Sequence, residues 1–235
     1  MKRSVTNKNA PQAKTSDLLI IALLAYLALL VQPIAEYIIV WTPLIDDLPL
    51  GDDIWTLIMN LICISAWAGI GLWLVRLSKK ECGFDIFQKT TPLSTPRLLI
   101  SLGIAAVFAV IMLLLGGLSF PYTICGFTDV ILTIVYYLFR IAHASILVLV
   151  IVTAQRGLDI AKPNQYIPFG GIALGTGMAI SNLISGFSSN GEPIMVLISA
   201  AVVFVCALFY GAVYVAAEKK PLYAAPIIIL MYVLI

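Results

Sequence analysis

The sequence of 235 residues is poor in charge, has one histidine and has no closely spaced cysteines. Charged residues make up 11% of the chain, whereas a soluble domain carries about 25%. Hydrophobic residues make up 61%, so the main solvent of the chain is expected to be lipid. The formal net charge of +2 does not indicate a nucleic-acid partner. None of the four cysteines forms a CxxC pair, which argues against a zinc or redox motif.

The scarcity of titratable groups also limits the chemistry of the chain. His143 is the only histidine, so neither an HExxH motif nor a histidine-rich zinc site can form. No two acidic residues lie within one apolar segment, and the serines there lack a histidine or lysine at the spacing of a base. We therefore predict no catalytic residue, no metal site and no cofactor.

Long apolar segments are abundant, and each of them except the last approaches the length that crosses a bilayer, about 20 residues. Segments this long lack the alternation of a membrane barrel, so they predict an all-α, polytopic membrane helix bundle. A tail over residues 1–16 precedes a single transmembrane domain over residues 17–235. The first segment is too long for a signal peptide and is predicted to be an uncleaved span. The seven predicted spans are residues 17–41, 54–76, 98–118, 129–154, 167–186, 194–217 and 222–235. The last one is short and could be a half-span, a tilted helix end or a terminus buried in the bundle.

Lysine and arginine gather on one side of the predicted membrane. Thirteen of the fourteen fall in the N-terminal tail and in the loops after the second, fourth and sixth spans. The opposite loops contain acidic residues instead, such as Asp46, Asp129 and Glu192. The positive-inside rule then predicts a cytoplasmic N-terminus, and we expect the protein to lie in the plasma membrane. In the longest basic loop, the stretch CGFDIF either connects two spans or lies on the membrane surface with Phe84, Ile86 and Phe87 inserted.

Small residues recur at four-residue spacing in two neighbouring spans. Gly171, Gly175 and Ala179 share one face of the fifth span, and Ala207 and Gly211 share one face of the sixth. Such stripes allow helix backbones to approach closely. They predict a tightly packed bundle and carry no further indication of function.

The fourth span contains the strongest polar signal. Tyr136, Arg140 and His143 follow the i, i+4, i+7 spacing of one helical face. An arginine near the bilayer midplane costs about 2.5–3.5 kcal/mol on insertion scales and cannot lose its proton, so Arg140 should face inward toward acceptors. Glu36 is the best predicted counter-charge, and Asn60 and Asn182 could join the cluster. The cluster has three possible roles: a structural lock between helices, a ligand-binding cavity, or proton-coupled or catalytic work.

The second half of the chain resembles the CPBP family, the Abi-like intramembrane proteases related to CAAX prenyl endopeptidases. The order of IVTAQRG (151–157), the glycine-rich fifth span and FYGAVYVAAEKKPLYAAP (209–226) carries this resemblance. Arg156 and Gly157 match the end of the family motif EExxxRG. Its glutamates, however, would fall on Ile151 and Val152, and the histidine of FxxxH would fall on Asn182, with Met178 at the phenylalanine. The last segment holds no histidine, so the resemblance implies a divergent member without the catalytic motifs.

Three functions remain open at this point. The first is a non-catalytic CPBP-like protein that binds or scaffolds a membrane partner, a peptide or a lipid-linked ligand, as in bacteriocin immunity. The second is a small-solute transport component with an outward-facing polar pocket around Glu36, Asn60, Arg140 and Asn182. The third is a divergent intramembrane protease, which the single histidine and the missing glutamate pair disfavour.

Overall fold

Every regular element that the computed structural model describes is an α-helix. The described residues are 14–41, 52–88, 91–114, 127–163, 166–189 and 191–234. The helices are α1 (Thr15–Ala28), α2 (Val31–Trp41), α3 (Asp52–Cys82), α4 (Thr95–Leu114), α5 (Phe127–Ala161), α6 (Phe169–Ser188), α7 (Pro193–Ala216) and α8 (Pro221–Val233). Within these ranges, six helical segments are long and apolar enough to cross a membrane, with α1 and the first part of α2 counted together. The predicted all-α, multi-pass membrane fold is therefore confirmed.

The seventh predicted span is a short helix. The 13 residues of α8 reach about 20 Å at 1.5 Å per residue, less than the roughly 30 Å of the hydrocarbon core. The first predicted span is also interrupted, because a turn at Leu29 and Leu30 separates α1 from α2. The carbonyl of Ala28 at this break accepts a hydrogen bond from the indole Nε1 of Trp67 at 2.8 Å, which satisfies a backbone group that the interrupted helix leaves free.

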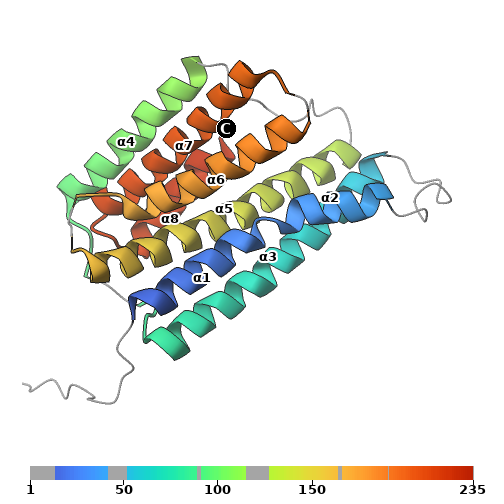
Figure 1. Cartoon of the computed structure of the whole chain (residues 1–235). Coiled ribbons are helices and arrows are strands. Elements are labelled where there is room, and N and C mark those ends of the chain that lie inside the picture. Colours follow the sequence, from blue (N-terminus) through green and yellow to red (C-terminus); the bar gives the residue numbers. More distant parts are fainter. Residues whose placement is uncertain are drawn as a thin grey trace, which may run out of the picture.

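Helix α5 is the central element of the bundle. It packs against α1 and α3 on one side and against α6 and α8 on the other, and α7 and α4 follow beyond α6 (Figure 1). Its segment from Ile146 to Gln155 is buried without interruption. A helix that is apolar all round is expected in such a position, and the sequence ILVLVIVTAQ meets this requirement apart from its polar end.

The predicted small-residue stripes bring α6 and α7 into close contact. A Cβ atom added to Gly171 would lie 2.6 Å from the carbonyl oxygen of Ala207, and one added to Gly211 would lie 2.6 Å from the Cα of Gly171. Only glycine allows backbones to approach this closely.

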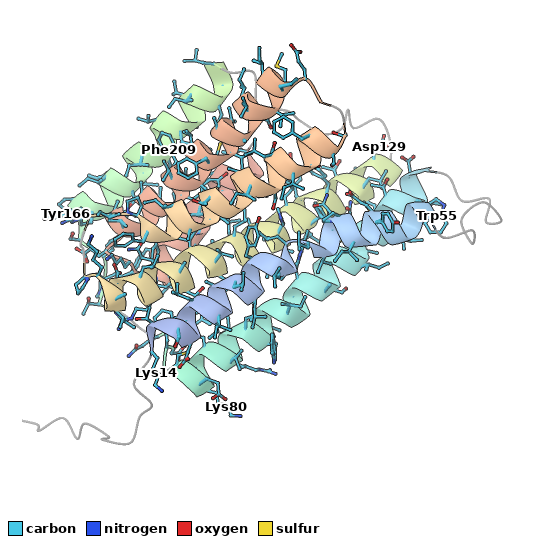
Figure 2. The ribbon with its side chains drawn as sticks, in the orientation of Figure 1. Lys14, Trp55, Lys80, Asp129, Tyr166 and Phe209 are labelled. Atoms are coloured by element: carbon cyan, nitrogen blue, oxygen red, sulfur yellow. The ribbon has the colours of Figure 1, made fainter. Side chains whose placement is uncertain are left out.

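Basic residues gather at one end of the bundle. Lys14 and Lys80 lie at one end, whereas Trp55 and Asp129 lie at the opposite end (Figure 2). We call the first the basic end, which also holds Arg97, Arg156 and Lys220. Helices α3 and α5 continue past their predicted apolar limits to Cys82 and Ala161 at this end, because a helix can extend beyond the hydrocarbon where water covers its surface.

Candidate functional site

The polar face of α5 meets the last turn of α8. Nη2 of Arg140 donates a hydrogen bond to the backbone oxygen of Tyr232, and the guanidinium carbon lies 4.3 Å from the centroid of the Tyr232 ring. The ring of Tyr136 is 6.0 Å from the same carbon. The final carbonyls of a helix lack intrahelical partners and carry the negative end of its dipole. Arg140 therefore caps α8 with charge, a hydrogen bond and a cation–π contact.

His143 binds the same tyrosine by its side chain. Its Nδ1 and the hydroxyl of Tyr232 form a hydrogen bond, and its ring packs 4.8 Å from that of Trp67. Trp67 in turn lies 5.1 Å from Phe139. Tyr232 thus forms a hydrogen bond with each of Arg140 and His143, through its carbonyl and its hydroxyl, and aromatic rings pack beside them.

The prediction that Glu36 is the counter-charge of Arg140 is wrong. Glu36 is exposed and accepts a hydrogen bond from Gln32 Nε2 at 2.9 Å, one turn earlier on α2. Among the described residues, Arg140 forms no ion pair within 4.0 Å. Asn60 is buried and Asn182 half-buried, and neither makes a side-chain hydrogen bond with Arg140 or His143 within that part of the chain. A backbone carbonyl replaces the acid because the end of α8 supplies the missing negative charge.

This arrangement joins two helices and offers little chemistry. Within the described residues, no three His, Cys, Asp or Glu side chains are grouped so that they could hold a metal ion. Arg140 Nε is buried without a hydrogen-bond partner among them, yet the guanidinium faces the ring of Tyr232. Among the described residues, no side-chain hydrogen bond or ion pair joins Glu36, Asn60, Arg140 and Asn182, the four residues of the predicted outward-facing pocket.

An apolar cavity of about 530 Å³ lies between α3, α5 and the start of α8. We call it the lateral cavity. Helices α3 and α8 both pack against α5, and small residues leave the space between them open, namely Ala68, Gly71, Ala142 and Ala225. Its polar lining atoms are already engaged, since Ser145 Oγ donates to the Ile141 carbonyl at 2.8 Å and Trp67 Nε1 to that of Ala28. The walls therefore suit a hydrocarbon chain.

The rim of the lateral cavity faces the side of the bundle. Leu72, Phe87 and Leu222 on this rim are 58%, 65% and 56% exposed, whereas Trp67 and Ile146 on its floor are almost fully buried. In a protein whose long helices span a membrane, the surroundings of such a rim are lipid. A chain could thus enter from the bilayer without crossing the bundle.

A second polar cluster, which the sequence reasoning missed, lies at the basic end. It links α5 to the connection between α5 and α6 and to the connection between α7 and α8. The buried Gln155 accepts from the backbone N–H of Gly170 at 2.9 Å and donates to the carbonyl of Ile167 at 3.1 Å and to Asp159 Oδ1 at 3.0 Å. Asp159 also pairs with Lys219 at 2.7 Å. The i, i+4 spacing of Gln155 and Asp159 at the end of an apolar run was the available signal.

The residues that match the CPBP motif lie in this region. Gly157 lets α1 approach, because an added Cβ would lie 3.3 Å from the side chains of Leu18 and Leu19. Arg156 is exposed, and its guanidinium lies 5.9 Å from the ring of Phe84. Ile151 and Val152, where the resemblance would place the two glutamates, are fully buried in the apolar core.

Comparisons of the chain with protein-family models, with curated proteins and with solved structures found no match.

Proposed function

We propose that this multi-pass membrane protein is a non-catalytic binding protein for a lipid or lipid-linked ligand, whose chain occupies the lateral cavity. The supporting observation is the cavity itself, with about 530 Å³ of apolar space and a rim exposed at the side of the bundle. This volume lies within the range of ligand sites, about 300–1,000 Å³.

The positions of the other groups favour binding over catalysis. The polar face of α5 is occupied by Tyr232. If the resemblance to the CPBP family reflects kinship, the glutamate positions hold the buried apolar side chains Ile151 and Val152. General acid–base catalysis needs a titratable group within reach of the substrate. A CPBP-like scaffold that retains a lipid site is the function we infer, with its basic end in the cytoplasm.

Cavity filling tests this proposal. A Cβ atom at residue 71 would meet Ile146 Cδ1 at 3.4 Å and Leu149 Cδ1 at 3.7 Å, which are tolerable contacts, so Gly71→Leu should project into the cavity. Gly69 is the matched control, since nothing lies within 4 Å of its added Cβ. Membranes containing a lipid with a photoactivatable acyl chain would be irradiated, and cross-links to Ala142 and Ala225, two half-buried residues of the cavity lining, would be measured by peptide mass spectrometry.

We expect cross-links to both residues in the wild type and in Gly69→Leu, and their loss in Gly71→Leu. Equal cross-linking in all three proteins would show that the chain contacts the outside of the bundle only, and would contradict the proposal. Thermal unfolding in detergent would check that both variants remain folded.

A further inference from the structure

The lateral cavity is closed at the basic end by a short loop that follows α3. Residues 83–88, which we call the cap loop, contribute Ile86 and Phe87 to the cavity lining. The loop is fixed to α3 through Ser78, whose Oγ donates to the carbonyl of Phe84 at 2.9 Å and whose own carbonyl accepts from the Phe84 N–H at 3.1 Å. Ile86 is buried. Ile86 thus inserts into the bundle itself, which differs from the alternative in which it inserts into the membrane surface.

Two cations flank this loop on the faces that line the cavity. On α3, Lys79 lies four residues after Val75 and seven after Leu72, both lining residues, and so shares their face. On α5, Arg156 lies seven residues after Leu149 in the same way. The loop connects them, because Lys79 pairs with Asp85 at 2.7 Å and Arg156 lies over the ring of Phe84.

We propose that this cavity selects an anionic membrane lipid, whose chain lies among α3, α5 and α8 and whose phosphate headgroup binds Lys79 and Arg156 beside the cap loop. The inference depends on the proposed function, since it names the ligand class of the same cavity. It follows from charge complementarity, because the apolar walls end at two cations at the level where a lipid headgroup would lie. A phosphate accepts hydrogen bonds from both kinds of side chain.

Asp85 is the internal competitor of the headgroup. Its hydrogen bond with Lys79 holds the pKa of the Asp85 carboxyl below its usual range, so this carboxylate is ionised at neutral pH. The pair is solvent-exposed on the Lys79 side, and exposed ion pairs are weak. A phosphate can therefore displace the carboxylate from Lys79 without a large loss.

The experiment compares two tryptophans of α3 as reporters. Trp67 lines the cavity, whereas Trp73 lies outside its lining and is exposed on the same helix. Two proteins would be made, each with one of these residues as its only tryptophan and the other three replaced by phenylalanine. Each would be reconstituted in mixed phosphatidylcholine and phosphatidylglycerol bilayers in which one of the two lipids carries brominated chains. Fluorescence quenching then gives the binding ratio of the anionic to the zwitterionic lipid at each reporter.

We expect a ratio clearly above one at Trp67 and close to one at Trp73. Lys79→Gln and Arg156→Gln should each lower the Trp67 ratio about fivefold, the effect of one cation near a membrane surface. Lys80→Gln is the control, because Lys80 lies off the cavity face and pairs with Glu81. Asp85→Asn should raise the ratio, and Glu81→Gln, an equal charge change, should not.

The outcomes separate the two proposals. Equal quenching of Trp67 by both brominated lipids, unchanged by Lys79→Gln and Arg156→Gln, would overturn the headgroup inference and leave the lipid cavity intact. Absence of quenching of Trp67 by either lipid would overturn the proposed function as well. Equal loss of selectivity in Lys80→Gln would assign the effect to the general charge of the basic end and so also contradict the headgroup site.

Discussion

At the residue scale, Arg140 shows how a membrane helix can hold a permanent cation on a backbone carbonyl, with no acidic partner among the residues that the structure describes. The spacing of Tyr136, Arg140 and His143 predicts a shared face, and the structure places all three beside one another. Their partner could not be predicted, because Tyr232 is 92 residues away from Arg140 in the sequence and accepts through its backbone oxygen. Every residue has such an oxygen, and only the end of a helix leaves it free.

Tyr232→Phe tests the side-chain half of this contact. The change removes the hydroxyl that binds His143 but leaves the carbonyl and the ring that Arg140 uses. We expect the free energy of unfolding to fall by about 1 kcal/mol, the net worth of one hydrogen bond, as measured by reversible unfolding in detergent. Tyr137→Phe should change little, since the Tyr137 hydroxyl makes no hydrogen bond within the described residues. Equal effects of both changes would contradict the assignment.

Glu218 occupies a backbone position that usually belongs to glycine. Its φ is 56°, and it directly follows the end of α7. The N–H of Glu218 donates to the Val215 carbonyl and the N–H of Lys219 donates to the Tyr214 carbonyl, each at 3.0 Å. This is the Schellman pattern, in which the left-handed residue is most often glycine. The Lys220 ammonium, by its hydrogen bond, holds the pKa of the Glu218 carboxyl below its ordinary value, but this pair is exposed at the carboxylate.

Glu218→Gly should therefore be more stable than Glu218→Ala. Both changes remove the carboxylate, and only glycine relieves the left-handed conformation, which costs other residues about 1–2 kcal/mol. Thermal unfolding of the two variants side by side would measure the difference. A higher Tm for the alanine variant would show that the backbone here is not strained.

At the element scale, the bundle is organised by which helices can approach closely. The glycine stripes predict the contact of α6 and α7 because glycine at four-residue spacing leaves a continuous groove. The interruption between α1 and α2 was not predicted, although Pro33 lies in the first turn of α2, just after it. Proline has no N–H to donate to the Leu29 carbonyl four residues earlier, and its ring crowds that carbonyl, so the helix breaks at Leu29 and Leu30. The indole of Trp67 then binds the free Ala28 carbonyl from another helix.

Gly171→Ala should separate α6 from α7. The new Cβ would lie 2.6 Å from the Ala207 oxygen and 2.9 Å from the Gly211 Cα, and these backbone atoms cannot rotate away. We expect a loss of about 1–3 kcal/mol in the free energy of unfolding, typical of an overpacked core. In Gly69→Ala, where the Cβ meets nothing within 4 Å, stability should be unchanged or slightly higher. Similar stability of the two variants would contradict the close approach.

At the scale of the whole molecule, the two ends of the bundle differ in charge. The alternation of basic loops along the sequence predicts this difference, and the structure places Lys14 and Lys80 together, far from Asp129 (Figure 2). The lateral cavity was not predicted from the sequence. It arises from a space that α3, α5 and α8 leave between them, and its small lining residues look like ordinary packing residues when read along one helix.

Cysteine labelling in cells would establish which end faces the cytoplasm. In a background without the four native cysteines, Asp129→Cys should react with a membrane-impermeant maleimide added to intact cells. Lys80→Cys should react only after permeabilisation, because the positive-inside rule keeps the basic end inside. The reverse pattern would invert the topology, and it would also move the proposed headgroup site to the outer leaflet.

The contact between Arg140 and Tyr232 also sets an order of events during synthesis. The two residues are separated by 92 positions, which a ribosome needs roughly 5–20 s to translate. Throughout this interval α5 already exists, whereas the carbonyl that neutralises its guanidinium has not yet been made. The growing protein must keep its fourth long segment in the shelter of the insertion machinery, or of water, until α8 arrives to complete it.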